Sequence, residues 1–165
     1  MNQHELRFVR LKNEITHELD HLDALQSELC LIERADFDIT SAKIRALASI
    51  LHDFYTGYER IFERIAEEFE GGLPSGPNWH RLLLQDMAFD LAAVRPPVIG
   101  EETAKILQDY LAFRYRFRNV YGYELDYARI KPLLRDLPEV MELVKNELHR
   151  FLARQEEVLS DGRKP

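Results

Sequence analysis

The sequence contains very little cysteine: Cys30 is the only one among its 165 residues. A single cysteine excludes an intrachain disulfide and a zinc site built from cysteines. Because Cys30 lies between Leu29 and Leu31, we expect its thiol to be buried and inert. No apolar run approaches the roughly 18 residues of a membrane-spanning helix, and the first residues lack the uninterrupted apolar core of a signal peptide. We therefore expect a cytoplasmic protein that makes no membrane contact.

Positive charge is also in short supply. The 22 lysines and arginines face 29 aspartates and glutamates, which leaves a formal net charge of -7. This balance argues against nonspecific coating of nucleic acid and against attraction to anionic membranes, so any contact with nucleic acid must be local. The length fits one domain over residues 1–159, large enough to bury about two-thirds of its unfolded surface, followed by a flexible tail at 160–165.

Helical periodicity is present almost everywhere, whereas little is typical of strands. Two long segments with apolar residues in heptad rows predict an antiparallel helical hairpin, and the glycines and prolines of residues 71–78 predict a loop. Gly57, in the middle of the second helix, predicts a close helix crossing within the chain or between two subunits. We predict an all-α fold, an up-and-down bundle of about five helices. The expected helices span about 4–33, 40–70, 79–93, 101 to a bend near Gly122, and the residues after Pro132.

The block from Phe113 to Gly122 carries three arginines and no acid. On a helix Arg114 and Arg118 lie one turn apart at the edge of an apolar stripe, whereas Arg116 points away from them. Two interpretations stay open for this pair: internal salt bridges to Glu or Asp, or a site for phosphate or an RNA backbone, because a guanidinium binds both groups in a bidentate manner. The stripe expected to face the core consists of Ile106, Tyr110, Phe113, Phe117 and Val120.

Two further places contain residues that often carry chemistry. Trp79, His80 and Arg81 directly follow the predicted loop, where they form either the edge of a site or a plug and cap at the end of the bundle. His17 and His21 stand four residues apart but lack the third ligand and the glutamate of an HExxH arrangement. We therefore expect no metal site and no cofactor.

Three segments together resemble the HepT-like proteins of the HEPN superfamily: residues 46–62, the Trp79-His80 pair and the Phe113 to Gly122 block. The resemblance extends over about residues 4 to 152. It implies a bundle of four or five helices that forms a homodimer, and an endoribonuclease that needs no metal. It also implies a toxin whose partner is a nucleotidyltransferase of the MNT type, which acts as the antitoxin and modifies a tyrosine near the active site.

The nuclease signature of the superfamily is an arginine, four to six residues and a histidine, often with a tyrosine two positions later. Arg114, Asn119 and Tyr121 match this frame, with asparagine in place of histidine. Since Arg114 and Tyr121 are seven positions apart, we expect them to share one helical face. An amide cannot take a proton from a ribose hydroxyl at neutral pH, so Asn119 would contribute by orienting a group or donating a hydrogen bond.

The resemblance leads to three hypotheses. In the first, an active ribonuclease uses Arg114 and Arg118 for RNA phosphate, Tyr121 for positioning or as a modified residue, and His80 as the replacement base, with two copies of the arginine face forming one cleft across a dimer. In the second, a catalytically inactive HEPN protein binds RNA or a nucleotidyltransferase. In the third, the bundle is structural and both arginines form internal salt bridges.

Overall fold

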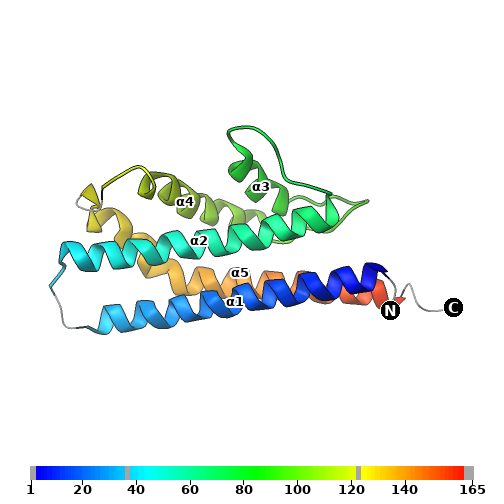
Figure 1. Ribbon diagram of the computed structural model, residues 1–165, viewed down its shortest axis with the longest axis horizontal. Coiled ribbons are helices and arrows are strands. Elements are labelled where there is room, and N and C mark those ends of the chain that lie inside the picture. The colour runs from blue at the N-terminus through cyan, green and yellow to red at the C-terminus, as the bar shows by residue number, and fades with distance from the viewer. Residues whose placement is uncertain (1–2, 36–37, 122–123, 162–165) are drawn as a thin grey trace.

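The computed structural model describes residues 3–35, 38–121 and 124–161. The three long helices of this part run side by side, and the two shorter ones lie against one side of α2 (Figure 1). The helix α2 packs against all four others. The prediction of an all-α bundle is confirmed. The helices are α1 (Gln3–Arg34), α2 (Ser41–Phe69), α3 (Trp79–Met87), α4 (Glu101–Phe117) and α5 (Tyr127–Asp161).

The predicted heptad rows form the hairpin of α1 and α2. Thr40 caps α2, since its hydroxyl accepts a hydrogen bond from the backbone N–H of Lys43 at 3.2 Å. The close crossing predicted at Gly57 occurs within the chain, because a Cβ there would lie 2.8 Å from Cδ2 of Leu22. The prediction for Cys30 is wrong: the residue is exposed, since the neighbouring Leu29 faces the core and successive helical residues turn by about 100°.

The loop after α2 depends on glycine, as Gly71 and Gly76 have φ of 77° and 95°. The next helix begins at Trp79 as predicted but ends at Met87, well before the expected end at residue 93. The reason is Arg95, whose guanidinium donates to the carbonyl oxygens of Asp86 at 3.0 Å, Pro96 at 3.3 Å and Phe89 at 3.5 Å. These bonds satisfy carbonyls where α3 ends and hold the chain in a turn.

The end of α4 also differs from the prediction. The helix stops at Phe117, and Ile106 and Val120 of the expected core stripe are each 38% exposed. The side-chain amide of Asn119 donates to the carbonyl oxygen of Tyr115 at 2.8 Å, which satisfies a carbonyl left open at the helix end. The expected bend at Gly122 lies outside the described residues.

The last helix begins earlier than predicted and contains Pro132 and Pro138. The carboxylate of Asp126 accepts a hydrogen bond from the N–H of Ala128 at 3.0 Å, so the helix starts there rather than after Pro132. Its other end includes Ser160 and Asp161, which were expected in the tail; residues 162–165 of that tail lie outside the described residues. No helix in the described part combines the length and hydrophobicity needed to cross a membrane.

Candidate functional site

Two ionisable side chains are buried where α2 faces α4. Glu59 lies on the same side of α2 as the buried residues Tyr55 and Phe62, and it is 3% exposed. Arg114 belongs to the buried side of α4 and is 8% exposed. Charged side chains are seldom buried to this extent unless they are paired.

One carboxylate connects three helices. Oε1 of Glu59 forms an ion pair with Nη2 of Arg114 at 3.1 Å, and Oε2 of Glu59 lies 2.7 Å from Nδ1 of His80. Since His80 is the second residue of α3, the contacts bring α2, α3 and α4 together at one point. We call Glu59, His80 and Arg114 the Glu59 cluster.

Arg114 is incompletely paired within this cluster. Its Nε and Nη1 atoms are buried and have no hydrogen-bond partner among the residues that the structure describes. Buried polar groups in proteins are nearly always hydrogen-bonded, and each one left unpaired costs about 1–3 kcal/mol. A guanidinium with two unused donors is therefore an unfavourable way to build a purely structural salt bridge.

His80 has one nitrogen committed and one available. When Nδ1 carries the ring proton and donates a hydrogen bond to Glu59, Nε2 keeps its lone pair. Nε2 makes no hydrogen bond to the part of the chain described, and the side chain is 14% exposed. The imidazole ring stacks on Trp79 with centroids 3.7 Å apart and meets the ring of Tyr115 edge to face at 5.8 Å.

The charge of Glu59 affects the groups around it. The pKa of Tyr55 is raised by burial first and by Glu59 second, with Arg114 acting in the opposite direction. Burial, followed by Glu59 and Glu67, raises the pKa of the carboxyl of Glu63, while His80 and Arg114 lower it. The cluster thus lies in a region where several carboxylates surround one arginine and one histidine.

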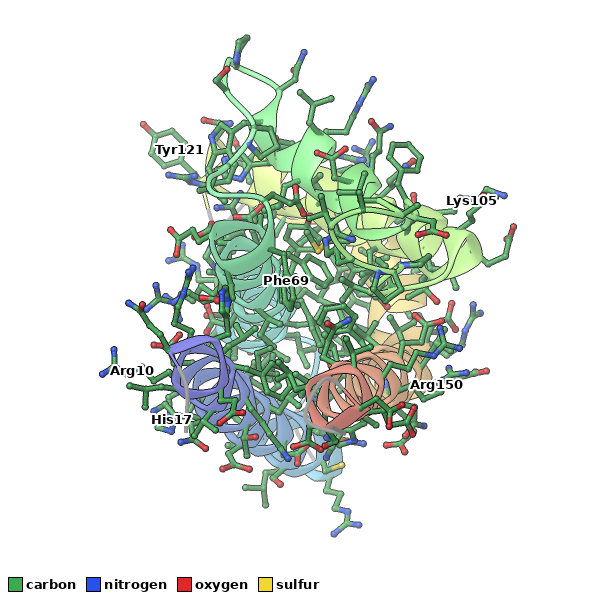
Figure 2. All side chains as sticks on the ribbon, turned by 90° about the vertical axis from the view of Figure 1, so that its right-hand side faces the viewer. Arg10, His17, Phe69, Lys105, Tyr121 and Arg150 are labelled. Carbon is green, nitrogen blue, oxygen red and sulfur yellow. The ribbon has the colours of Figure 1, made fainter. Side chains whose placement is uncertain are left out.

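The structure brings together two of the predicted site residues, Arg114 and His80, through Glu59. Arg118 follows the last residue of α4 and is exposed, and it forms no salt bridge with any described residue. Asn119 caps the end of α4. Tyr121 lies beyond the helix and is 69% exposed, so it does not share a helical face with Arg114 as predicted; it points outward in Figure 2.

Glu59 is not among the site residues predicted from the sequence. It falls inside an apolar row of α2, with Tyr55 four positions before it and Phe62 three positions after it. An acid at a buried helical position needs a cationic partner, and this break in the row was the available signal.

The other candidate places do not join the cluster. The rings of His17 and His21 lie 4.4 Å apart, and the described residues contain no group of three or more side chains that could hold a metal ion. A hollow of about 280 Å³ between the end of α4 and the start of α5 is lined by Phe113, Phe117 and Ile130, among others, but by no member of the Glu59 cluster.

In the comparison with protein families, a family model described as HepT-like protein matches residues 46–155. The matched segment includes every member of the Glu59 cluster and most of α2 and α5. Searches of curated proteins and of solved structures find no match.

Proposed function

The chain belongs to the HepT-like family, of the HEPN type, and from this membership we propose that it is an endoribonuclease that cleaves RNA at the Glu59 cluster without a metal ion. The observation that carries the proposal is the single carboxylate shared by a histidine and an incompletely paired arginine. A general base, a group that orients it and a phosphate-binding cation are the components that cleavage of RNA by its own 2′-hydroxyl requires.

In the proposed reaction, Nε2 of His80 takes the proton of a ribose 2′-hydroxyl. The 2′-oxygen then forms a bond to the adjacent phosphorus, and the bond from phosphorus to the 5′-oxygen of the next nucleotide breaks. The leaving 5′-oxygen takes a proton from water, which yields a 2′,3′-cyclic phosphate and a 5′-hydroxyl, and the imidazolium of His80 gives its proton to the hydroxide that remains. Glu59 accepts the hydrogen bond from Nδ1 and stabilises the imidazolium that forms.

Arg114 is assigned to the negative charge of the phosphate. Its Nε and Nη1 are covered in the unbound protein, so we expect the side chain to move and to exchange part of its contact with Glu59 for a phosphate oxygen. Arg118, exposed one turn further along, approaches the neighbouring phosphates from outside. Asn119 has no catalytic part in this scheme, because its amide caps α4.

The test is a cleavage assay with end-labelled RNA in the presence of EDTA. We expect the wild type to produce cyclic phosphate ends, and His80→Ala to lower the rate by roughly 10²- to 10⁴-fold, the usual contribution of a general base. His52→Ala is the matched control, because His52 also contacts a carboxylate, that of Asp53 at 3.1 Å, yet lies outside the cluster. Equal rates for the two variants, both folded, would remove His80 from the mechanism.

The second candidate function is RNA binding without catalysis, and the hydrogen bonding of Asn119 favours this candidate. The residue at the position of the signature histidine is an amide already bonded to the backbone of α4. This candidate is selected if the wild type binds RNA in a salt-sensitive manner and produces no cyclic phosphate.

We also propose the toxin role, the homodimer and the MNT-type nucleotidyltransferase partner that family membership suggests. The exposure of Tyr121, 69%, supports it as the modified residue. Incubation with the partner enzyme and ATP should increase the mass of the wild type, and Tyr121→Phe should abolish that increase. A sedimentation measurement that finds a monomer at all concentrations would contradict the proposed homodimer.

A further inference from the structure

Aromatic rings surround the Glu59 cluster on the side of α3. Trp79 and His80 stack with an angle of 27° between their planes, and Tyr115 meets His80 at 81°. Trp79 is partly buried against the core, while Tyr115 is 38% exposed. The tyrosines Tyr55, Tyr58 and Tyr110, by contrast, are each about 1% exposed.

The charges of Glu59 and Arg114 act on the pKa of the Tyr115 phenol. Its pKa is raised by partial burial first and by the charge of Glu59 second, while Arg114 acts in the opposite direction. The ring therefore presents an accessible aromatic surface next to the atoms assigned to the reaction.

Unpaired cations follow these rings in the sequence. Arg81 follows His80 on α3, and Arg116 and Arg118 follow Tyr115; all three are exposed and form no salt bridge with the described part of the chain. Arg7 and Arg64, on the side where α2 meets α1, differ because carboxylates neutralise them: Arg7 pairs with Glu68 at 3.0 Å, and Arg64 with Glu67 at 3.0 Å.

From this arrangement we propose that Trp79 and Tyr115 form a stacking platform for an unpaired base, so that the substrate of the Glu59 cluster is single-stranded RNA. The inference rests on the proposed function. Aromatic side chains beside a positively charged track are the means by which proteins hold single strands. In a duplex each base face is already covered by its neighbours, so a double-stranded RNA cannot use the platform.

The platform also determines which nucleotide of the substrate lies next to the reacting groups. A base stacked against Trp79 or Tyr115 places its ribose near His80, whose ring lies between the two, and the attached phosphate near Arg114. The 2′-hydroxyl that reacts then belongs to the stacked nucleotide.

The experiment uses Trp79 as its own probe, because it is the only tryptophan in the chain. Oligonucleotides with 2′-O-methyl riboses cannot be cleaved, so binding is measured apart from catalysis. We expect the single strand to quench the tryptophan fluorescence and to bind at least about 10-fold more tightly than a hairpin of the same composition. A single abasic position should weaken binding by roughly 5- to 100-fold, the usual contribution of one stacked base.

Variants of Trp79 and Tyr115 test whether the affinity lost at an abasic position arises from these two rings. Trp79→Leu and Tyr115→Leu should each weaken binding of the intact strand, measured by anisotropy of a labelled oligonucleotide, and should remove most of the abasic penalty. Phe89→Leu is the matched control, since Phe89 is 54% exposed at the other end of α3. Trp79→Phe keeps an aromatic ring and should retain most of the affinity, which distinguishes stacking from a loss of folding.

Each outcome decides one claim. Equal binding of single strand and hairpin by the wild type, no abasic penalty, or no binding at all overturns the platform without reference to any variant. Cleavage that is lost with His80→Ala but is equal in Trp79→Leu and Phe89→Leu keeps the proposed function and removes the platform. Strand-selective binding without any cleavage keeps the platform and removes the proposed function.

Discussion

Within the described residues two arginines, Arg95 and Arg114, are buried against carboxylates, and their hydrogen bonding differs. Arg95 directs Nε and Nη2 to Glu70 at 2.8 and 2.6 Å, and its remaining hydrogen bonds go to backbone carbonyls. Arg114 has one ion pair and two buried nitrogens without a partner in the described residues. The first is a completed structural element that ends α3 and fixes its orientation. The second retains the donor groups that an anion from outside would need.

The largest effect is expected at Arg95. Arg95→Met removes every hydrogen bond of a buried guanidinium and leaves Glu70 without its partner, so we expect a loss of about 3–5 kcal/mol in the free energy of unfolding, measured by urea denaturation. The surface variant Arg129→Met, which breaks an exposed pair with Asp126 at 3.7 Å, should change it by less than about 1 kcal/mol. A small effect of Arg95→Met would show that α3 is held by packing alone.

Arg114→Met should affect function more than stability. We expect RNA cleavage to fall by at least about 100-fold, as for loss of a group that stabilises transition-state charge. The unfolding free energy should fall by less than in Arg95→Met, about 1–2 kcal/mol, because Nε and Nη1 of Arg114 have no partner to lose and Glu59 keeps its hydrogen bond with His80. If Arg114→Met destabilises the protein as much as Arg95→Met and cleavage follows the folded fraction, the distinction between the two arginines is wrong.

Glu59→Gln tests the link between arginine and histidine. The amide fits the same space but no longer carries the charge that holds Nδ1 of His80, so we expect cleavage to fall by roughly 10- to 100-fold. Combined with Arg114→Met, it should recover part of the stability that Arg114→Met loses, because the carboxylate that has lost its cation is then replaced by a neutral amide. Additive stability losses in the double variant would argue against a shared network.

The smallest effect concerns Glu63, whose pKa is raised by burial, Glu59 and Glu67. A carboxyl with a higher pKa in the folded state binds its proton more tightly there, so the unfolding free energy decreases as pH rises from the unfolded value of about 4.5 through the folded value. Glu63→Gln should therefore be more stable than wild type at pH 7, by less than about 1 kcal/mol, and similar to it below about pH 4. Urea midpoints across this range provide the check, and lower stability of the variant at pH 7 would contradict the account.

Sequence alone was sufficient for the helices that depend on local pattern. The heptad rows of α1 and α2 and the glycines of the following loop each act within a few residues. The ends of α3 and α4 depend instead on side chains that bond back to carbonyls, those of Arg95 and Asn119. Such bonds leave no periodic signal.

The site was predictable only in part for the same reason. His80 and Arg114 stood out as residue types in unusual surroundings, whereas Glu59 connects them across three helices. Tyr121 was placed on the face of Arg114 because the helix was extended too far. Spacing in the sequence relates residues on one helix, whereas the contacts of Glu59 join three helices and depend on the tertiary fold.

Arg114 keeps donor nitrogens for an anion that the described residues do not supply. The direct measurement is the ¹H–¹⁵N spectrum of the arginine Nε–H groups with and without a single-stranded 2′-O-methyl RNA, assigned by the signals that vanish in Arg114→Lys and Arg95→Lys. We expect RNA to shift the Nε–H signal of Arg114 and to slow its exchange with water, while that of Arg95 stays unchanged. An Arg114 signal that does not change at saturating RNA would contradict the account.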